Sequence, residues 1–399
     1  MLKTETRGNV AYTFNLPAKK KAPLRVFEAF AGVGSQRMAL RNIGANFEVV
    51  GISEWDKNAI KSYQAIHGSD NEKDFASSMS EDIINQRLYK LGISKDGKNP
   101  ASELEIAKMP IDEKSNIMNH IMNHKNFLSI VGANPEKIPD HDLFTYSFPC
   151  QDISVSGKQG GFEKDSGTRS GLLWECQKII EAKKPKYLLL ENVKNLVMGK
   201  HLDGFNKWLE WLEGQGYTNY WKILNSKDFG VPQSRERVFV VSVLGDHEAF
   251  EFPKENETPT TIQDVLEDEV EERYFSKKSL RRTRKRNYIQ YDNSGKGYES
   301  QACRFYFIDG IMGTVPHSNS GDKTQICSLK KDGDTTDFEW ARRMTPLEVW
   351  RIMGMSDEDF FKAQKVNSNI HLYKQAGNSI VVNVLEAIFE QVLKVDNRL

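Results

Sequence analysis

The stretch VFEAFAGVGSQRMAL, residues 26–40, decides the fold of this chain. Its apolar beginning predicts a buried strand over residues 24–28, and the pattern after the turn predicts a helix near residues 35–43. Gly32 and Gly34 lie in the turn, where missing side chains let a ligand approach the backbone and the helix N-terminus. An ordinary tight turn between a strand and a helix would carry the same glycines, so both interpretations stay open.

Downstream of this stretch, apolar runs of strand length alternate with helical patterns. The predicted strands lie at 47–53, 142–148, 186–190 and 237–243, and the helical stretches between them include 172–182 and 202–214. Such alternation is typical of an α/β fold, here a doubly wound, Rossmann-like sheet with a smaller, irregular second domain.

Changes in composition divide the chain into three parts. Residues 1–245 are expected to form the main domain, with a charged, motif-free insertion at about 84–139 on the edge of the sheet. Residues 246–340 contain short turn-rich strands and clusters of charge, which predicts a separate small domain. Helical periodicity returns in residues 341–399, whose last helix is apolar enough to pack back on the first domain.

The overall composition is that of an ordinary globular protein, with 39% hydrophobic and 28% charged residues among 399. The 55 basic and 55 acidic residues cancel, so net charge does not point to nucleic acid. No apolar run reaches the roughly 18 residues that span a bilayer, and the beginning of the chain lacks the apolar core of a secretory signal. We therefore expect no membrane contact and a cytoplasmic location.

Neither a disulfide framework nor a metal site is expected. The four cysteines have wide, irregular spacings and form no CxxC motif: Cys150, Cys176, Cys303 and Cys327. His120 and His124 stand four residues apart, as in a helical metal pair, but no third ligand or catalytic glutamate accompanies them. A cysteine with a chemical role must therefore act without a second cysteine or a metal.

Cys150 is that cysteine, because it follows a strand end. Pro149 cannot donate to a further ladder, so the strand at 142–148 must stop there and leave the thiol just beyond it. In an open parallel sheet, ligands bind outside the carboxyl ends of the strands. Cys150 is thus placed where a reactive group is expected.

Two residues after the second strand suggest a nucleoside pocket. Glu54 can accept both hydroxyls of a ribose, and Trp55 can stack on an adenine. With the glycine turn, they predict a site for an adenosyl ligand. Their spacing does not separate a nicotinamide dinucleotide from S-adenosylmethionine, since both contain an adenosine ribose.

A carboxylate follows a further buried strand, because Glu191 comes directly after the apolar run Leu188–Leu190. It could cap a helix or meet solvent. Its position at the same sheet edge as Cys150 favours chemistry instead. A thiolate beside an acid is suited to attack on an electron-poor ring that is protonated in the same step.

Two groups of basic residues could bind anions. Gln233, Arg235 and Arg237 alternate as they enter a strand, which aims all three at one face. The second group lies in SLRRTRKRNYIQY, residues 279–291, where arginines stand beside tyrosines and suit phosphate contacts. Solvated arginines on a surface would give the same patterns, so neither group decides the partner alone.

Eight short motifs, in one order along the chain, resemble those of the cytosine-5 DNA methyltransferase family of prokaryotic or phage restriction-modification type. They are FAGVGS, EW, PCQ, RSGLLWE, ENV, QSRER, RMTPLEVWRIMG and QAGNSIVV. The chain departs from the family pattern in two places. Ser35 stands where many members have a second consecutive glycine, and SEDI at 80–83 is followed by the long insertion.

The resemblance implies roles for individual residues. Cys150 would be the nucleophile, Glu191 the acid at the base, and Arg235 and Arg237 the residues that order the target cytosine and its phosphate. The cofactor S-adenosyl-L-methionine would be surrounded by Phe30, Ala31, Gly32, Gly34, Glu54, Trp55, Asp82, Ile83, Pro149, Leu172, Asn378 and Ser379. Contacts with double-stranded DNA are expected from Gln151, Ser154, Ser156, Gln233, Arg281, Arg282, Arg284 and Thr314. Residues 246–340 would recognise the target sequence, and the expected assembly is a monomer.

The implied chemistry agrees with the residues. Carbon 5 of cytosine is a weak nucleophile, so a thiolate must first add at carbon 6 to make the ring enamine-like. An acid at ring nitrogen 3 would remove the charge that this addition develops. Since the ring is inaccessible inside a duplex, the nucleotide must be flipped out, at a cost of a few kcal/mol.

Three other functions remain open at this point. A tRNA cytosine methyltransferase would share the core and the chemistry, although the long basic recognition segment favours DNA. A DNA-binding protein without activity would not need Cys150, Glu191 and both arginines. A nicotinamide dehydrogenase would explain the glycine turn and Glu54 but leave PCQ and residues 246–340 without a role.

Overall fold

The structure is a computed structural model. It describes residues 2–7, 10–15, 21–148, 172–255, 259–276, 282–284, 287–291, 303–317, 324–329 and 338–398. The helices are α1 (Ser35–Asn42), α2 (Lys57–His67), α3 (Glu81–Leu91), α4 (Glu103–Ala107), α5 (Ile111–Asn123), α6 (Leu173–Lys183), α7 (Leu202–Gly214), α8 (Pro346–Ile352), α9 (Asp357–Gln364), α10 (Asn369–Asn378) and α11 (Val382–Val395).

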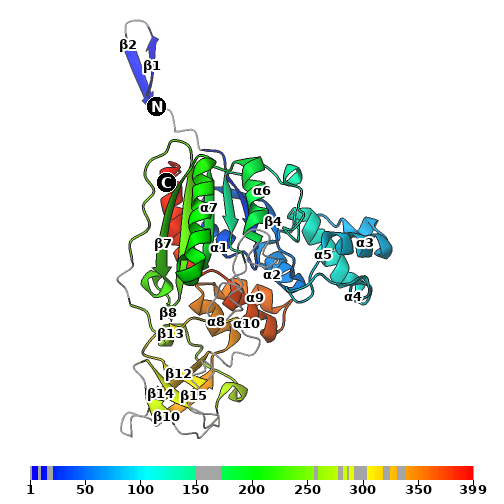
Figure 1. The fold of residues 1–399 in the computed structure, drawn as a ribbon, viewed down its shortest axis with the longest axis vertical. Helices are drawn as coiled ribbons and strands as arrows, with labels where there is room; N and C mark the ends of the chain where they lie inside the picture. Colours follow the sequence, from blue (N-terminus) through cyan, green and yellow to red (C-terminus); the bar gives the residue numbers. More distant parts are fainter. Residues whose placement is uncertain are drawn as a thin grey trace.

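Most of the strands belong to two sheets (Figure 1). They are β1 (Leu2–Arg7), β2 (Val10–Asn15), β3 (Leu24–Ala29), β4 (Phe47–Ser53), β5 (Leu143–Tyr146), β6 (Tyr187–Val193), β7 (Tyr217–Asn225), β8 (Gln233–Ser234), β9 (Glu236–Leu244), β10 (Arg282–Arg284), β11 (Tyr288–Tyr291), β12 (Arg304–Phe307), β13 (Met312–Gly313), β14 (Gln325–Leu329) and β15 (Phe338–Arg343). The five strands predicted within residues 1–245 are all found.

The large sheet has the strand order β4-β3-β5-β6-β9-β7. Strands β4, β3, β5 and β6 are parallel, whereas β9 runs antiparallel to both of its neighbours. The predicted doubly wound, Rossmann-like α/β fold is thereby confirmed, with one reversed strand. The sequence did not predict β7, because only Tyr217 and Leu224 of this edge strand are buried and it carries no continuous apolar run.

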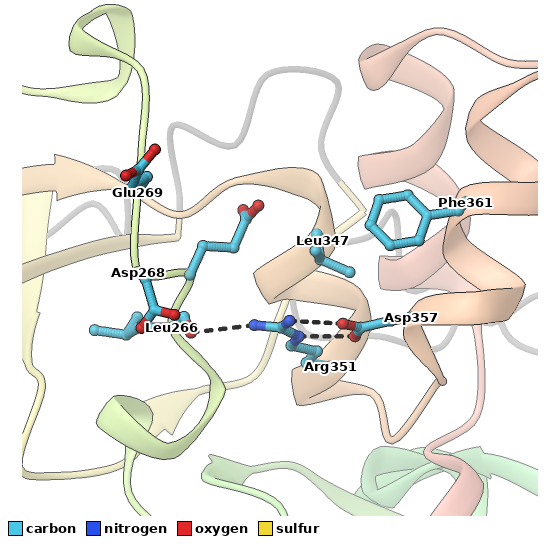
Figure 2. A pocket seen from close by; sticks show the side chains of 8 residues that line it. Leu266, Asp268, Glu269, Leu347, Arg351, Asp357 and Phe361 are labelled. Atoms are coloured by element: carbon cyan, nitrogen blue, oxygen red, sulfur yellow. Dashed lines mark hydrogen bonds and ion pairs between the residues drawn. The ribbon is translucent and has the colours of Figure 1, made fainter.

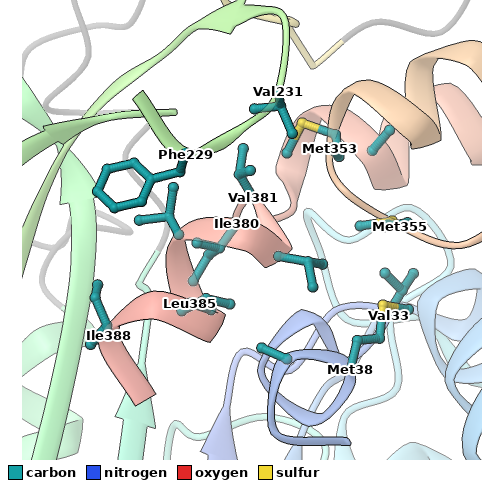
Figure 3. Packing of buried hydrophobic residues seen from close by; sticks show 14 of the residues in the cluster. Val33, Met38, Phe229, Val231, Met353, Met355, Ile380, Val381, Leu385 and Ile388 are labelled. Atoms are coloured by element: carbon teal, nitrogen blue, oxygen red, sulfur yellow. The ribbon is translucent and has the colours of Figure 1, made fainter. Parts of the chain in front are cut away.

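Apolar side chains cover both faces of the large sheet. Along β3 the side chains alternate, so that Val26 packs on the side of α1 and α11 while Phe27 packs on the side of α6 and α7. In the first cluster, Val33 and Met38 lie next to each other on the side of Met355, and Leu385 of α11 belongs to the same cluster (Figure 3). Burial on both faces explains why β5 and β6 read as continuous apolar runs.

The insertion forms a group of helices beyond β4, at one edge of the large sheet (Figure 1). Helices α3, α4 and α5 share a hydrophobic cluster of their own, which includes Ile84, Leu88 and Ile117. The chain then returns to the sheet, where Asn126 pairs with Ile52 in a parallel bridge. This return places residues 125–128 directly beside the end of β4.

The second sheet, in the order β10-β11-β12-β14-β15, lies at the opposite end of the molecule from β1 and β2 (Figure 1). Its small cluster contains Ile289, Phe305 and Cys327. Behind it, Arg342 donates to both oxygens of Glu348 on α8 at 2.7 Å, and both side chains are buried. Among the described residues, no helix is long and apolar enough to cross a membrane.

Candidate active site

The glycine turn after β3 meets the end of β4. Because Ala29 and Ser53 are paired in the parallel register, the next residues of both strands leave the sheet together. The Gly32 N–H then donates to Glu54 Oε2 at 2.8 Å. Gly32 has a φ of +58°, and no atom lies within 4 Å of the position that a Cβ would take. This turn therefore leaves open space beside a buried carboxylate.

Gly34 needs its missing side chain for a different reason. Its φ is +83°, and a Cβ there would come within 2.3 Å of His67 Nε2. His67 in turn contacts the Val33 carbonyl at 3.0 Å. The second glycine thus allows α1 to begin close against α2, which is a packing role.

Asn126 holds Glu54 in place from the other side. Its Oδ1 accepts the N–H of Glu54 at 3.0 Å and that of Leu128 at 2.9 Å, while Nδ2 donates to the Glu54 carbonyl at 2.9 Å. The side chain is only 3% exposed. Lys125 and Leu128, on either side, have positive φ values of 48° and 54°, a conformation that non-glycine residues adopt at a cost.

The environment of Glu54 makes its carboxyl a weaker acid. Burial, and next the charge of Asp56, raise the pKa of the Glu54 carboxyl to about 7. The N–H groups of Gly32 and Asp56, the latter at 2.7 Å, act in the opposite direction. Glu54 can therefore change its charge near neutral pH, which matters for any ligand that needs it as an acceptor.

Four other residues predicted to surround the cofactor pack in the hydrophobic clusters around the glycine turn or hydrogen-bond to the end of β4. Phe30, with a φ of +56°, and Leu172, which precedes α6, pack against the same hydrophobic cluster. Trp55 packs against the cluster of the insertion helices. Ala31 is buried, and its N–H donates to the Ser53 carbonyl at 3.2 Å.

Asp82 and Ile83 are placed elsewhere. Both are exposed in the first turn of α3, and Ile83 is 44% exposed. The chain beside Glu54 is instead formed by residues 125–128, which follow α5. Helices α4 and α5 lie between these two segments in the chain, so it is residues 125–128, and not SEDI, that contact Glu54.

The turn after α10 is tied to the same region. Lys374 donates to Asp56 Oδ2 at 2.9 Å, and Gln375 Nε2 donates to the Asn58 carbonyl at 3.0 Å. Asn378, the last residue of α10, is exposed, and Ser379 is buried. The structure thus brings the end of α10 to the helix that follows Glu54.

Glu191 lies at the end of β6 in a polar cluster that we call the Glu191 cluster: Ser147, Glu191 and Arg237. Tyr146 pairs with Leu190, so Ser147 and Glu191 are the next residues along their parallel strands. Ser147 Oγ donates to Glu191 Oε2 at 2.5 Å, and Arg237 Nε lies 3.2 Å from Oε1. Glu191 is 6% exposed and Arg237 is half-buried.

The neighbouring residue, Asn192, fixes the chain that leads toward Cys150. Its Nδ2 donates to the Phe148 carbonyl at 3.1 Å, and the side chain is 2% exposed. Through Ser147 and Phe148, the end of β6 therefore holds two of the three residues that precede Pro149. The strand β5 itself ends at Tyr146, two residues earlier than Pro149 would require.

Arg235 and Gln233 are buried in a second polar cluster, which we call the junction: Gln233, Arg235, Val315, Gly377 and Ser379. Gln233 has no exposed surface, and Arg235 is 5% exposed. Gln233 Oε1 accepts the Val315 N–H at 2.8 Å. Thr314, predicted to contact DNA, donates from Oγ1 to the Ser234 carbonyl at 3.0 Å. The alternating motif QSRER therefore sends its two arginines to different surroundings.

Several predicted site residues lie outside the described residues. They are Pro149, Cys150, Gln151, Ser154, Ser156 and Arg281. For Arg282 and Arg284 the structure gives the backbone of β10, which pairs antiparallel with β11.

Two cavities lie apart from the residues predicted from the sequence. One, of about 450 Å³, lies among Leu266, Glu267, Asp268, Glu269, Leu347, Arg351, Asp357 and Phe361 (Figure 2). The other, of about 410 Å³, is lined by residues such as Lys57, Lys61 and His371. Within the described ranges, no group of three or more His, Cys, Asp or Glu side chains could hold a metal ion.

Two contacts of the site were not found by sequence reasoning. Asn126 lies in a motif-free insertion, and its contact with Glu54 depends on the return of the chain to β4. Ser147 reads as part of an apolar strand. It could have been noticed as the polar residue one step past the paired residues Tyr146 and Leu190.

Comparison with known proteins identifies the family. The model of the C-5 cytosine-specific DNA methylase family matches residues 24–89 and 89–394. The type II methyltransferase M2.ScrFI of Lactococcus lactis subsp. cremoris is 44% identical over 381 residues, which cover 93% of this chain and 99% of that protein. The orphan methyltransferase M.SssI of Spiroplasma monobiae is 36% identical over 394 residues, covering 94% and 98%.

Solved structures agree on the fold. The Dnmt2 methyltransferase of S. pombe superposes with a TM-score of 0.57 at 17% identity, covering 94% of this chain and 99% of that one. The methyltransferase EhMeth of Entamoeba histolytica gives a TM-score of 0.60 at 16% identity, with the same coverage of 94% and 99%. At such identities the likeness concerns the fold alone, whereas the family match rests on the sequence. The chain belongs to the C-5 cytosine-specific DNA methylase family, whose members methylate cytosine in DNA with S-adenosyl-L-methionine as methyl donor.

Proposed function

We propose that this enzyme methylates carbon 5 of a cytosine within a specific sequence of double-stranded DNA, with S-adenosyl-L-methionine as the bound methyl donor. The observation that carries the proposal is the Glu191 cluster. A buried carboxylate there contacts Ser147, three residues before Cys150, and also an arginine. A nucleophile, an acid and a cation are thereby expected at one edge of the sheet.

The end of β4 fits the adenosyl part of the donor. Glu54 is buried beside the open space at Gly32, and its oxygens have lone pairs left beyond their two backbone N–H partners. Each of the two ribose hydroxyls could donate to this carboxylate, and the exposed Asn378 could bind a polar group of the donor. When bound, S-adenosyl-L-methionine supplies an electrophilic methyl group. The residues of this chain orient it and keep water away.

The residues at the carboxyl ends of β5 and β6 would act on the cytosine. The Cys150 thiolate would form a bond to carbon 6, and Glu191 would donate a proton to ring nitrogen 3 as the electrons of the ring move toward it. Arg237, which lies 3.2 Å from Glu191 through Nε, is placed to fix the orientation of the carboxylate. After methylation, a base would take the proton from carbon 5, the ring electrons would expel the thiolate, and the proton on nitrogen 3 would return to Glu191, which restores the aromatic ring, Cys150 and Glu191.

Target choice would belong to the small sheet and the loops around it. We propose residues 1–245 as the catalytic part, 246–340 as the target-recognition part and 341–399 as a segment that returns to the first. The basic strand β10 and its neighbours would contact phosphates, while bases are read in the major groove. The name of the relative with 44% identity, a type II methyltransferase, supports a restriction-modification role. The enzyme would act as a monomer on DNA in the cytoplasm of a prokaryotic cell.

Bisulfite sequencing of DNA treated with the purified enzyme tests this proposal. Protection of cytosines in one short sequence, and only when S-adenosyl-L-methionine is added, is the expected result. Methylation spread over all sequence contexts would contradict site specificity. Transfer of labelled methyl to tRNA with none to duplex DNA would contradict the substrate.

A further inference from the structure

Arg235 joins two distant parts of the chain through backbone carbonyls. It lies between β8 and β9, and its Nη1 donates to the Val315 carbonyl at 3.0 Å. Its Nη2 donates to the carbonyls of Gly377 at 3.1 Å and Ser379 at 3.0 Å. With 5% of its surface exposed, this guanidinium is directed at the protein backbone.

The segments that meet at Arg235 are packed without room for adjustment. Strand β8 pairs in parallel with β13, so that Met312 lies opposite Gln233. Gln233 Oε1 accepts the Val315 N–H at 2.8 Å. Gln233 and Arg235 together therefore bind both the N–H and the carbonyl of Val315. A Cβ on Gly377 would come within 2.4 Å of the Pro316 oxygen.

Two residues with predicted ligand contacts stand directly beside the carbonyls that Arg235 holds. Asn378 lies between Gly377 and Ser379, so one nitrogen of Arg235 fixes the backbone on both sides of it. Its own side chain is exposed. Thr314 precedes Val315, and its hydroxyl donates to the Ser234 carbonyl at 3.0 Å.

We propose that Arg235 is a positioning residue that presents Asn378 to the cofactor and Thr314 to the DNA, and does not contact the target cytosine. The inference rests on the proposed function, which assigns cofactor and DNA contacts to these two residues. Arginine suits the task because a planar guanidinium reaches carbonyls on two segments at once. The ammonium of a lysine is a single donor centre and cannot span the same positions.

The variant Arg235→Lys tests this inference through affinities measured without turnover. Calorimetry should show binding of S-adenosyl-L-methionine weakened about tenfold, and DNA binding without cofactor should weaken by a similar factor, because each site loses its fixed backbone. Single-turnover methyl transfer at saturating cofactor and DNA should stay within about threefold of the unchanged enzyme. The DNA is a duplex with the sequence found by bisulfite sequencing.

Arg351→Lys is the matched control. Arg351 donates to the carbonyls of Val265 at 3.2 Å and Leu266 at 3.1 Å and pairs with Asp357 through two bonds (Figure 2). Arg351 also joins the proposed recognition part, residues 246–340, to a C-terminal helix. Its hydrogen bonds go to Val265, Leu266 and Asp357, and not to Asn378 or Thr314. Both affinities should remain unchanged in this variant, even if thermal stability falls as much as in Arg235→Lys.

The outcomes separate the inference from the function on which it rests. If Arg235→Lys keeps both affinities and loses transfer at saturation, Arg235 acts directly on the cytosine and the inference is wrong. If the enzyme without any substitution binds neither S-adenosyl-L-methionine nor DNA, the proposed function itself is contradicted. Should Arg235→Lys not fold, hydrogen exchange in the unchanged enzyme replaces it. Cofactor binding should then slow exchange at 312–316 as well as at 377–379, and no response at 312–316 would contradict the inference.

Discussion

Two arginines of one short motif lie in different surroundings. Arg235 is 5% exposed and binds three backbone carbonyls of the junction. Arg237, two residues later, is half-buried and lies 3.2 Å from the carboxylate of Glu191. The first therefore joins distant segments of the chain, whereas the second contacts the carboxylate that we propose acts on the cytosine. Identical residue types at alternating positions thus have different contacts, and only the packing around each one separates them.

The largest effect on methyl transfer is expected from a change in the Glu191 cluster. Glu191→Gln keeps the size and the contact with Ser147 but cannot donate a carboxylic proton, so single-turnover methyl transfer should fall by roughly 10²- to 10⁴-fold. Cofactor affinity should not change. Glu236→Gln is the control, since Glu236 is exposed on β9, the strand that pairs with β6, and forms an ion pair with Lys194 at 3.1 Å. A Glu191→Gln variant with normal transfer would remove Glu191 from the chemistry.

The next largest effect is expected in the pH dependence of cofactor binding at Glu54. The pKa of Glu54 is raised to about 7, so this carboxyl is protonated in the free enzyme at lower pH and must lose a proton to accept both ribose hydroxyls. Each pH unit below this value should therefore weaken S-adenosyl-L-methionine binding roughly tenfold, as calorimetry from pH 8 to about pH 5 would show.

Two variants test the assignment of this pH dependence. Glu54→Gln should bind the cofactor weakly at every pH, with the slope removed. Glu28→Gln should keep the slope, although burial also raises the pKa of Glu28 to about 7. A slope that persists in Glu54→Gln would show that another group titrates.

The comparison of the two arginines is sharpened by Arg237→Lys. Loss of the contact with Glu191 should lower the transfer rate at saturation about 10- to 30-fold and leave both affinities within about threefold, the reverse of Arg235→Lys. Rapid quench under single-turnover conditions measures this rate. Weakened cofactor binding with a normal rate in Arg237→Lys would erase the distinction between the two arginines.

The smallest effect is expected at Asn126. In Asn126→Asp the donor to the Glu54 carbonyl is lost and a second carboxylate is placed beside Glu54, so cofactor affinity should fall about three- to tenfold. Asn134→Asp is the control, because Asn134 is an exposed cap that accepts the Glu136 N–H at 2.9 Å. Equal cofactor affinities in both variants would show that Glu54 does not need the support of Asn126.

Local patterns in the sequence predicted the large sheet well. Burial on both faces leaves continuous apolar runs, so β3, β5 and β6 were visible, and the glycine turn was placed correctly between β3 and α1. The edge strand β7 carries no such run and was not predicted. Strand β6 continues to Val193, so Glu191 lies within the strand and not after it.

Contacts that depend on distant segments could not be predicted. Asp82 was assigned from the resemblance of SEDI to the family pattern, but residues 125–128 lie beside the end of β4 and contact Glu54. The burial of Arg235 depends on carbonyls that lie 80 and 142 residues further along the chain. No local periodicity encodes such partners. The assigned roles of the site residues, unlike the fold and the family, remain predictions.

The covalent step is the central claim of this account, and a duplex with 5-fluorocytosine at the target position tests it most directly. Fluorine cannot leave as a proton does, so the reaction should stop after methyl transfer with Cys150 still bonded to carbon 6. Among the described alternatives, Cys176 and Cys327 are poorly suited to attack, since both are buried and burial raises the pKa of the Cys176 thiol, whereas Cys303 is half-buried. We predict a denaturant-resistant adduct that requires S-adenosyl-L-methionine, maps to Cys150 and is absent in Cys150→Ala. An adduct that persists in Cys150→Ala, or that maps to another cysteine, would contradict the account.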